Sequence, residues 1–240
     1  SGALSVDGGT IKLDGNYPIG TDNVALGDTA LDSVQAGGNY NTVIGSKAGT
    51  AITTGDENTA VGSCSLLKTT TGARNVGVGA CVLICNITGT ENTAVGMNAA
   101  RLTTGSANVA VGHSALEDNT SGASNTALGR EALHTNTTAS NNVAVGKRAL
   151  YLNTTGTNNS AVGKDALNNN TEGDNNVAVG TGALVANTTA DNNTAVGMSA
   201  LLANTEGGGN TAIGLCAMNA NTTGDQNVAI GLNTMQDNTT

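Results

Sequence analysis

The chain has 240 residues and is unusually poor in aromatic side chains, with three Tyr, no Phe and no Trp, whereas 34 residues are Gly. Globular cores draw much of their buried area from large aromatic side chains, so this composition disfavours an ordinary globular domain. The net charge is −9 with scattered Lys and Arg, which argues against a nucleic-acid partner, and no apolar run approaches the roughly 18 residues that predict membrane insertion.

Residues 1–22 precede the repeats and do not share their register. Residues 10–13 alternate like a strand and residues 14–18 read as a turn, which together indicate a cap over the first coil of a stack. A calcium-binding loop in residues 7–9 and 14–16 is the alternative, although the glycine-rich calcium nonapeptide is not reproduced. We expect an N-terminal cap or docking segment at 1–22 and a repeat region at 23–240.

From residue 23 onward one phrase occurs thirteen times: Asn, a β-branched or small residue, a small residue, an aliphatic residue and Gly, as in residues 142–146. Ten of the twelve intervals between the closing glycines are 17 residues, the first being 18 and the fifth 16. Two helices with their turns need about 33 residues, and leucine-rich repeats need several Leu per unit. The period predicts an all-β fold, a parallel β-solenoid or β-roll with one 17-residue coil per repeat.

Each unit holds two candidate strands, represented by residues 143–145 and 149–152. Side chains alternate along a strand, so the residue before each glycine and the residue two earlier share a face, which we expect to point into the coil. The residue between them is Ala in eleven of thirteen units. Because water does not demand a small side chain, we expect this alanine row to face outward against another backbone. This interpretation predicts an oligomeric rod.

Asparagine opens all thirteen units, and a second Asn stands seven residues after the glycine in nine of them. Stacked Asn side chains can form a hydrogen-bonded ladder. N-glycosylation at sequons such as those of Asn136 and Asn187 is the alternative, but Asn also recurs without a sequon at Asn170 and Asn204. The expected structural ladder consists of Asn23, Asn41, Asn58, Asn75, Asn92, Asn108, Asn125, Asn142, Asn159, Asn176, Asn193, Asn210 and Asn227.

The four cysteines lack the spacing of a zinc site. Cys64 and Cys81 each stand two residues after a repeat glycine, so stacked coils would bring them about 4.8 Å apart, within reach of a disulfide. Filling of a variable turn is the alternative. His113 and His134 are expected at the surface without a fixed partner. No convergent titratable cluster or phosphate loop stands out, so we expect no enzyme activity, no cofactor and no metal site.

The phrase Asn-x-Ala-Val/Ile-Gly-x-x-Ala resembles the head repeat of YadA-like trimeric autotransporter adhesins, and its longer form is similar to repeats in bacteriophage tail-fibre proteins. The resemblance covers residues 23–240. It implies left-handed parallel β-rolls with three chains around one axis, which makes the rod a homotrimer. The repeat departs from the adhesin family by being a few residues longer, and the extra length falls in turns such as residues 153–156.

These patterns predict a structural fibre or adhesin-type stalk outside the cell, on a cell surface or on a virion. Its expected partners are further copies of itself and a surface glycan or receptor. The first alternative is a subunit of a head-to-tail extracellular filament. The second is a glycan- or ice-binding solenoid, suggested by a threonine row beside the second Asn. That row consists of Thr120, Thr137, Thr154, Thr171, Thr188, Thr205, Thr222 and Thr239.

Overall fold

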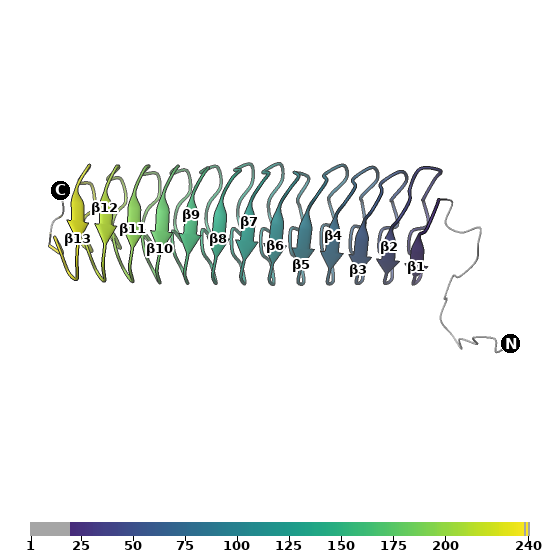
Figure 1. Ribbon diagram of the computed structural model, residues 1–240, viewed down its shortest axis with the longest axis horizontal. Helices are drawn as coiled ribbons and strands as arrows, with labels where there is room; N and C mark the ends of the chain where they lie inside the picture. The colour runs from purple at the N-terminus through teal and green to yellow at the C-terminus, as the bar shows by residue number, and fades with distance from the viewer. Residues whose placement is uncertain (1–19, 238, 240) are drawn as a thin grey trace.

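The structure is a computed structural model that describes residues 20–237 and residue 239. Thirteen parallel strands of three residues form one sheet in chain order, so the chain is an all-β solenoid with a repeat of about 17 residues, as the sequence predicted (Figure 1). The strands are β1 Val24–Leu26, β2 Thr42–Ile44, β3 Thr59–Val61, β4 Val76–Val78, β5 Thr93–Val95, β6 Val109–Val111, β7 Thr126–Leu128, β8 Val143–Val145, β9 Ser160–Val162, β10 Val177–Val179, β11 Thr194–Val196, β12 Thr211–Ile213 and β13 Val228–Ile230. Most of the expected N-terminal cap, with its alternative calcium loop, lies outside the described residues.

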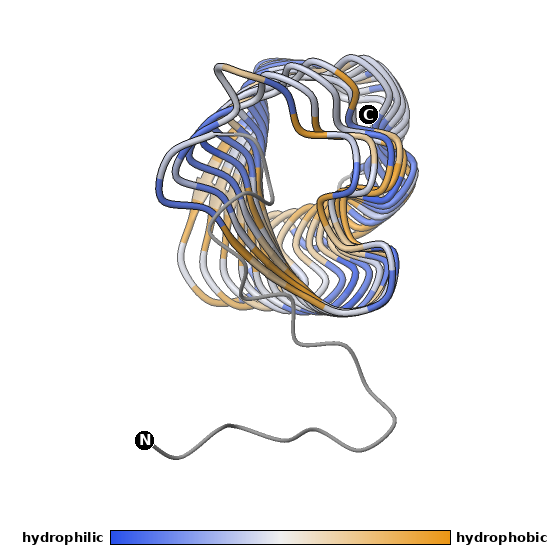
Figure 2. Cartoon of the chain, turned by 90° about the vertical axis from the view of Figure 1, so that its right-hand side faces the viewer, coloured by the Kyte–Doolittle hydropathy of each residue, from blue (hydrophilic) through white to orange (hydrophobic). Residues whose placement is uncertain are grey.

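Every coil stacks on the next in register. Val143 of β8 pairs with Ser160 of β9, and Val145 pairs with Val162. Hydrogen bonds between coils continue beyond the strands, since the N–H of Leu150 donates to a carbonyl of the following coil at 3.0 Å. Each residue therefore lies beside its counterparts about 17 positions away in the sequence. We call such a set of equivalent residues a column; Figure 2 looks along these columns.

The centre of each strand, not its two flanking residues, points into the coil. Ala144 is fully buried whereas Val143 is 38% exposed, and the middle residue is buried in all thirteen strands. The core consists of these strand centres packed against the buried columns that contain Ala149 and Leu150. The expected orientation was wrong, and the alanine row faces the interior of its own chain. The physical reason is that a leucine fills the narrow interior of most coils, which leaves room for little more than a methyl group opposite.

The second candidate strand, residues 149–152, is a turn and not a strand. Arg148 and Leu150 have φ values of 57° and 52°, in the left-handed region that a strand excludes. This conformation costs a non-glycine residue roughly 1–2 kcal/mol. It recurs in nearly every coil, because it turns the chain sharply while burying the leucine and keeping its N–H bonded to the next coil.

In two coils the strand centre is not alanine. The change in its size is compensated by an opposite change in a residue of the facing column, so the interior stays filled. In β4 the strand centre is Gly77, and the space of its missing Cβ is taken by Ser65 Oγ and Leu66 Cδ1 of the preceding coil. Ser65 Oγ also donates to the Gly77 carbonyl at 3.0 Å. In β2 the strand centre is the larger Val43, which contacts the space left by Gly49 in the leucine column. A larger residue in one column can compensate for a smaller residue in another only if the two columns contact each other inside the coil.

Candidate interaction surface

The outward side chains of the thirteen strands form one apolar surface, which we call the outer sheet face. Its first row holds the first residue of each strand: Val24, Thr42, Thr59, Val76, Thr93, Val109, Thr126, Val143, Ser160, Val177, Thr194, Thr211 and Val228. Its second row holds the third residue: Leu26, Ile44, Val61, Val78, Val95, Val111, Leu128, Val145, Val162, Val179, Val196, Ile213 and Ile230. Contiguous apolar surfaces of this extent mark interaction sites in soluble proteins.

The outer sheet face is uniform in shape because its first row consists almost entirely of Val and Thr, which are nearly isosteric. Both are β-branched and favour strands, and only Ser160 breaks this row. The row's hydroxyl groups, for example those of Thr59 and Thr126, have no hydrogen-bond partner within residues 20–237 and 239. In the second row, Val162 is 39% and Leu128 46% exposed. The face thus offers methyl groups and unpaired hydroxyls in a regular array.

One edge of the outer sheet face changes chemistry along the rod. The column directly after the repeat glycines carries exposed Met97 in the coil of β5 and exposed Met198 in the coil of β11. Between them, Arg130, Lys147 and Lys164 follow in successive coils. The face is therefore apolar along its strands and cationic along one edge over the coils of β7, β8 and β9.

A second feature is a column of charged and aromatic side chains in the turns behind the sheet. Arg101 Nε donates to Glu117 Oε1 at 2.8 Å, and His134 Nε2 lies 3.5 Å from Glu117 Oε2. The His134 and Tyr151 rings follow with centroids 5.2 Å apart. The expectation that His134 has no fixed partner was wrong, because stacking of coils brings residues 17 apart into contact. Burial acts to raise the pKa of Glu117, but hydrogen bonds from Ser114 and Arg101 outweigh it and lower that pKa.

Arg148 links this column to its neighbour. Its guanidinium carbon lies 5.3 Å from the centroid of the Tyr151 ring, and its Nε donates to Glu131 Oε2 at 2.7 Å. Arg130 pairs with the other carboxylate oxygen of Glu131, also at 2.7 Å. The hydrogen bond from Arg148, assisted by that from Arg130, lowers the pKa of Glu131 from 4.5 to about 2. These carboxylates are held ionised by paired cations, as in structural ion-pair networks.

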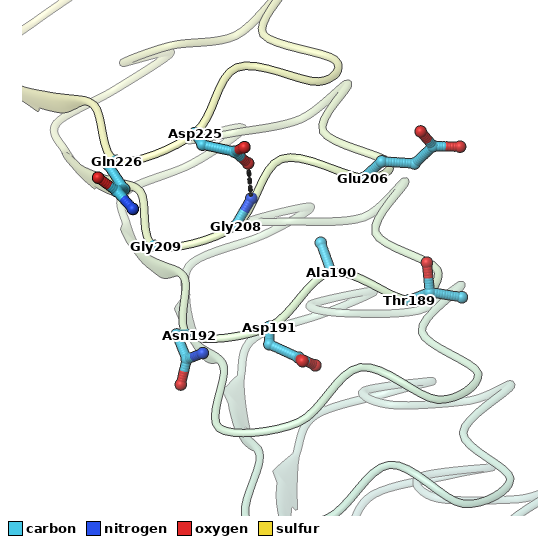
Figure 3. Close-up of a pocket in the computed structure, with 9 residues that line it drawn as sticks. All are labelled: Thr189, Ala190, Asp191, Asn192, Glu206, Gly208, Gly209, Asp225 and Gln226. Atoms are coloured by element: carbon cyan, nitrogen blue, oxygen red, sulfur yellow. Dashed lines mark hydrogen bonds between the residues drawn. The ribbon is translucent and has the colours of Figure 1, made fainter.

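A hollow of about 410 Å³ opens where one acidic column is interrupted by Gly208 (Figure 3). Asp191 Oδ1 accepts the N–H of Asp174 at 2.6 Å, and Asp225 Oδ1 accepts the N–H of Gly208 at 2.7 Å. The N–H of Asp191 lacks the equivalent acceptor because Gly208 has no side chain. Glu206 also lines the hollow. Within the described residues, no group of three or more His, Cys, Asp or Glu side chains could hold a metal ion.

The asparagines that open the repeats form a buried column along the rod. Asn142 is fully buried. Its N–H donates to Asn125 Oδ1 at 3.0 Å, and its Nδ2 donates to the Gly156 carbonyl at 2.8 Å. Its own Oδ1 accepts the N–H of Asn159 at 2.9 Å. Each side chain thus joins neighbouring coils through their backbones. Direct bonds between side-chain amides also occur near the start of the column, as from Asn58 to Asn41 at 3.1 Å.

The second asparagine column is also interior. Asn136 Nδ2 donates to Asn119 Oδ1 at 2.8 Å, and both Asn136 and Asn187 are fully buried. These sequon asparagines are therefore inaccessible to glycosylation in the folded chain. In the threonine row beside this column, Thr154 Oγ1 donates to the Thr171 carbonyl at 3.0 Å, and most members of the row repeat this bond. Their hydroxyls serve coil stacking, which weakens the case for this row as an ice- or glycan-binding surface.

Cys64, Cys81, Cys85 and Cys216 are free thiols of intermediate burial. No helix that could cross a bilayer occurs in the part of the chain that the structure describes.

Comparisons with protein-family models, with curated proteins and with solved structures found no match to this chain. The family resemblance of the repeat phrase stays a prediction.

Proposed function

We propose that this chain is a structural stalk, a rigid rod in a fibre on a cell surface or virion, whose copies associate side by side through their outer sheet faces. The observation that carries this proposal is the exposed apolar face that runs through all thirteen strands. Three copies is the number that the repeat phrase implies by its resemblance to trimeric adhesins. In this arrangement the two outward rows take the role that sequence analysis had given to the alanine row.

The stacking supports a load-bearing role. Thirteen coils at about 4.8 Å each give a rod roughly 60 Å long. Every coil is tied to the next by strand pairing, by the asparagine columns and by turn hydrogen bonds such as that from Thr154 to Thr171. Solenoids gain stability from such nearest-neighbour interfaces. Bending or stretching the rod would strain several bond types at every interface at once, which suits a spacer.

The outer sheet face can supply enough free energy for association. Full burial of an aliphatic side chain is worth about 1.5–3 kcal/mol. Many outward aliphatic side chains, such as Val143 at 38% and Leu128 at 46%, are exposed, so each of these would gain roughly 0.5–1 kcal/mol when covered. The other outward aliphatic side chains are of intermediate burial and gain less. Summed over both rows the gain is on the order of 10 kcal/mol, comparable with the 4–15 kcal/mol that association costs. Association should accordingly require many coils acting together.

The test is the solution mass of the full chain by light scattering. We expect three times the chain mass of 23.5 kDa. Replacing Val145 and Val162 with Asp should dissociate the assembly, because it would bury unpaired carboxylates at the interface. Thr155→Asp is the matched control, since Thr155 is exposed but lies outside the sheet. A monomeric wild-type chain would refute the proposal. Open-ended polymers that survive the double substitution would favour the head-to-tail filament instead.

A further inference from the structure

We propose that Cys64 and Cys81 are a redox modification site, where a disulfide joins the coil of β3 to the coil of β4 in the presence of a small-molecule disulfide such as oxidised glutathione. The two cysteines occupy one column in successive coils. Cys81 N–H donates to the carbonyl of Ser63, the residue before Cys64, at 2.9 Å. The φ values of Cys64 and Cys81 are 58° and 59°. Their Cα atoms are thus about one coil spacing apart, within the 4.4–6.8 Å that disulfides span.

Side chains in this column point in the same direction and meet between coils. Glu131 and Arg148 occupy the same column further along the rod, and their side chains touch at 2.7 Å. Both thiols are partly exposed, so a small oxidant can reach them. The other cysteines are placed differently. Cys85 belongs to a different column, four residues further along the coil than Cys81, where its sulfur lies 3.9 Å from Lys68 Nζ. The column neighbours of Cys216 are not cysteines.

Closing the bridge requires a small adjustment of the turns that carry the two thiols. Cβ atoms in a disulfide lie about 3.8 Å apart, so the turns must approach by about 1 Å from the coil spacing. Each cysteine follows a repeat glycine by two residues, Gly62 or Gly79, with φ values of 129° and 134°. The same pair of coils holds the irregular packing around Gly77. A covalent link therefore falls where the regular alanine core is interrupted.

The reaction is two successive thiol–disulfide exchanges. The thiolate of one cysteine attacks oxidised glutathione, forms a mixed disulfide and releases one glutathione. The thiolate of the second cysteine then attacks the protein sulfur of that mixed disulfide and releases the other glutathione. The two protein thiols lose two electrons and two protons, and the glutathione disulfide takes them up as two thiols.

The disulfide closes a short loop. It also lies between backbone hydrogen bonds that join the same two coils. The N–H of Leu66, two residues after Cys64, donates to the Val82 carbonyl, one residue after Cys81, at 2.9 Å. Local separation of the two coils breaks this bond, and the disulfide opposes that separation. We expect amide hydrogen exchange at Leu66 and Cys81 to slow by roughly tenfold or more in the oxidised chain.

The experiment is oxidation of the folded full chain with oxidised glutathione, followed by alkylation of the remaining thiols and tryptic digestion. Cleavage after Lys47, Lys68, Arg74 and Arg101 places Cys64 in residues 48–68 and Cys81 with Cys85 in residues 75–101. Mass spectrometry should find these two peptides disulfide-linked. Cys85→Ser, the matched control, should keep the link, and Cys81→Ser and Cys64→Ser should each abolish it.

Several outcomes would overturn the proposal. These are alkylation of both thiols after exposure to excess oxidant, a persistent glutathione adduct without ring closure, or a link that disappears in Cys85→Ser. A bridge between two chains would overturn it too, and non-reducing electrophoresis separates that species from the internal bridge. An unchanged exchange rate at Leu66 in the bridged chain would refute its effect on the coil interface.

Discussion

Gly77→Ala is expected to destabilise the coil of β4, although alanine stands at this strand position in most other repeats. A Cβ on residue 77 would overlap Leu66 Cδ1 and come within 2.7 Å of Ser65 Oγ. Overpacking of a filled core costs about 1–3 kcal/mol. The lower backbone entropy of alanine in the unfolded chain returns about 0.4–1 kcal/mol. The expected net loss of stability is therefore about 0.5–2 kcal/mol.

The cost of the same substitution should fall once Ser65 is also alanine. Ser65→Ala removes the Oγ that lies 2.7 Å from the added Cβ and donates to the Gly77 carbonyl. Leu66 Cδ1 must still move away, as the end of a flexible side chain can, and the alanine pair at Ala132 and Ala144 shows that this arrangement packs beside a leucine. We expect Gly77→Ala to be about neutral in that background, so the coupling between the two sites should be about 0.5–2 kcal/mol.

The assay is a double-mutant cycle read by urea unfolding and by hydrogen exchange of the amides in β4, because solenoids can open locally without unfolding as a whole. A Gly77→Ala variant that is neutral or stabilising in both backgrounds would refute the reasoning. It would mean that the strand centres do not face a packed interior, and the orientation expected from sequence would stand.

Three further substitutions test the columns. Asn142→Ala should cost about 1–3 kcal/mol in urea unfolding, because it leaves the buried Asn159 N–H without a partner and removes one of the two donors to the Gly156 carbonyl; a loss below about 0.5 kcal/mol would contradict this. Glu131→Gln should lower the thermal midpoint at pH 7. Because the pKa of Glu131 is lowered from 4.5 to about 2, its stabilisation is complete above pH 4.5 and disappears as the pH falls to about 2. Melting curves of variant and wild type should therefore converge with acidification, and divergence would exclude the ion pair as the cause. Gly208→Asn should raise stability by about 0.5–1.5 kcal/mol in thermal unfolding, since its Oδ1 can accept the free N–H at position 191. A lower midpoint would indicate that the 3.3 Å approach of its Cβ to the carbonyl of that residue is too close.

The period of the repeat predicted the stack of coils but could not decide which face of each strand lies inside. Alternation separates Ala144 from Val143 and Val145 without assigning either set to the core. Usually the more hydrophobic set of side chains is the buried one. Here the alanines are buried instead of the valines, because the interior of the coil is narrow. The sequence did contain a usable signal. Ser65 and Gly77 deviate in opposite senses of size from the alanines of their columns, which makes sense only if those columns pack together.

The turn after the strand was beyond sequence reasoning for a different reason. Leu150 is a residue that normally avoids positive φ, so the pair of residues 149 and 150 read as the start of a second strand. The left-handed conformation is stabilised by tertiary terms, namely burial of the leucine and its hydrogen bond to the next coil. For the same reason the contacts of His134 could not be foreseen. These contacts join side chains about 17 residues apart in the sequence. Such residues become neighbours only when the chain has closed into a coil.

The narrow bore and the apolar exterior have one cause. A coil of about 17 residues that fills its interior with one leucine and two alanines has no room for the aliphatic residues that its parallel strand also requires. Those aliphatic residues point outward in every coil. Each added coil therefore lengthens the outer sheet face by the same amount. The apolar area available for association therefore grows in proportion to the rod, whereas the entropy cost of joining rigid bodies is nearly independent of length. A rod of few coils should stay monomeric and a rod of many should associate, which couples assembly to the number of repeats.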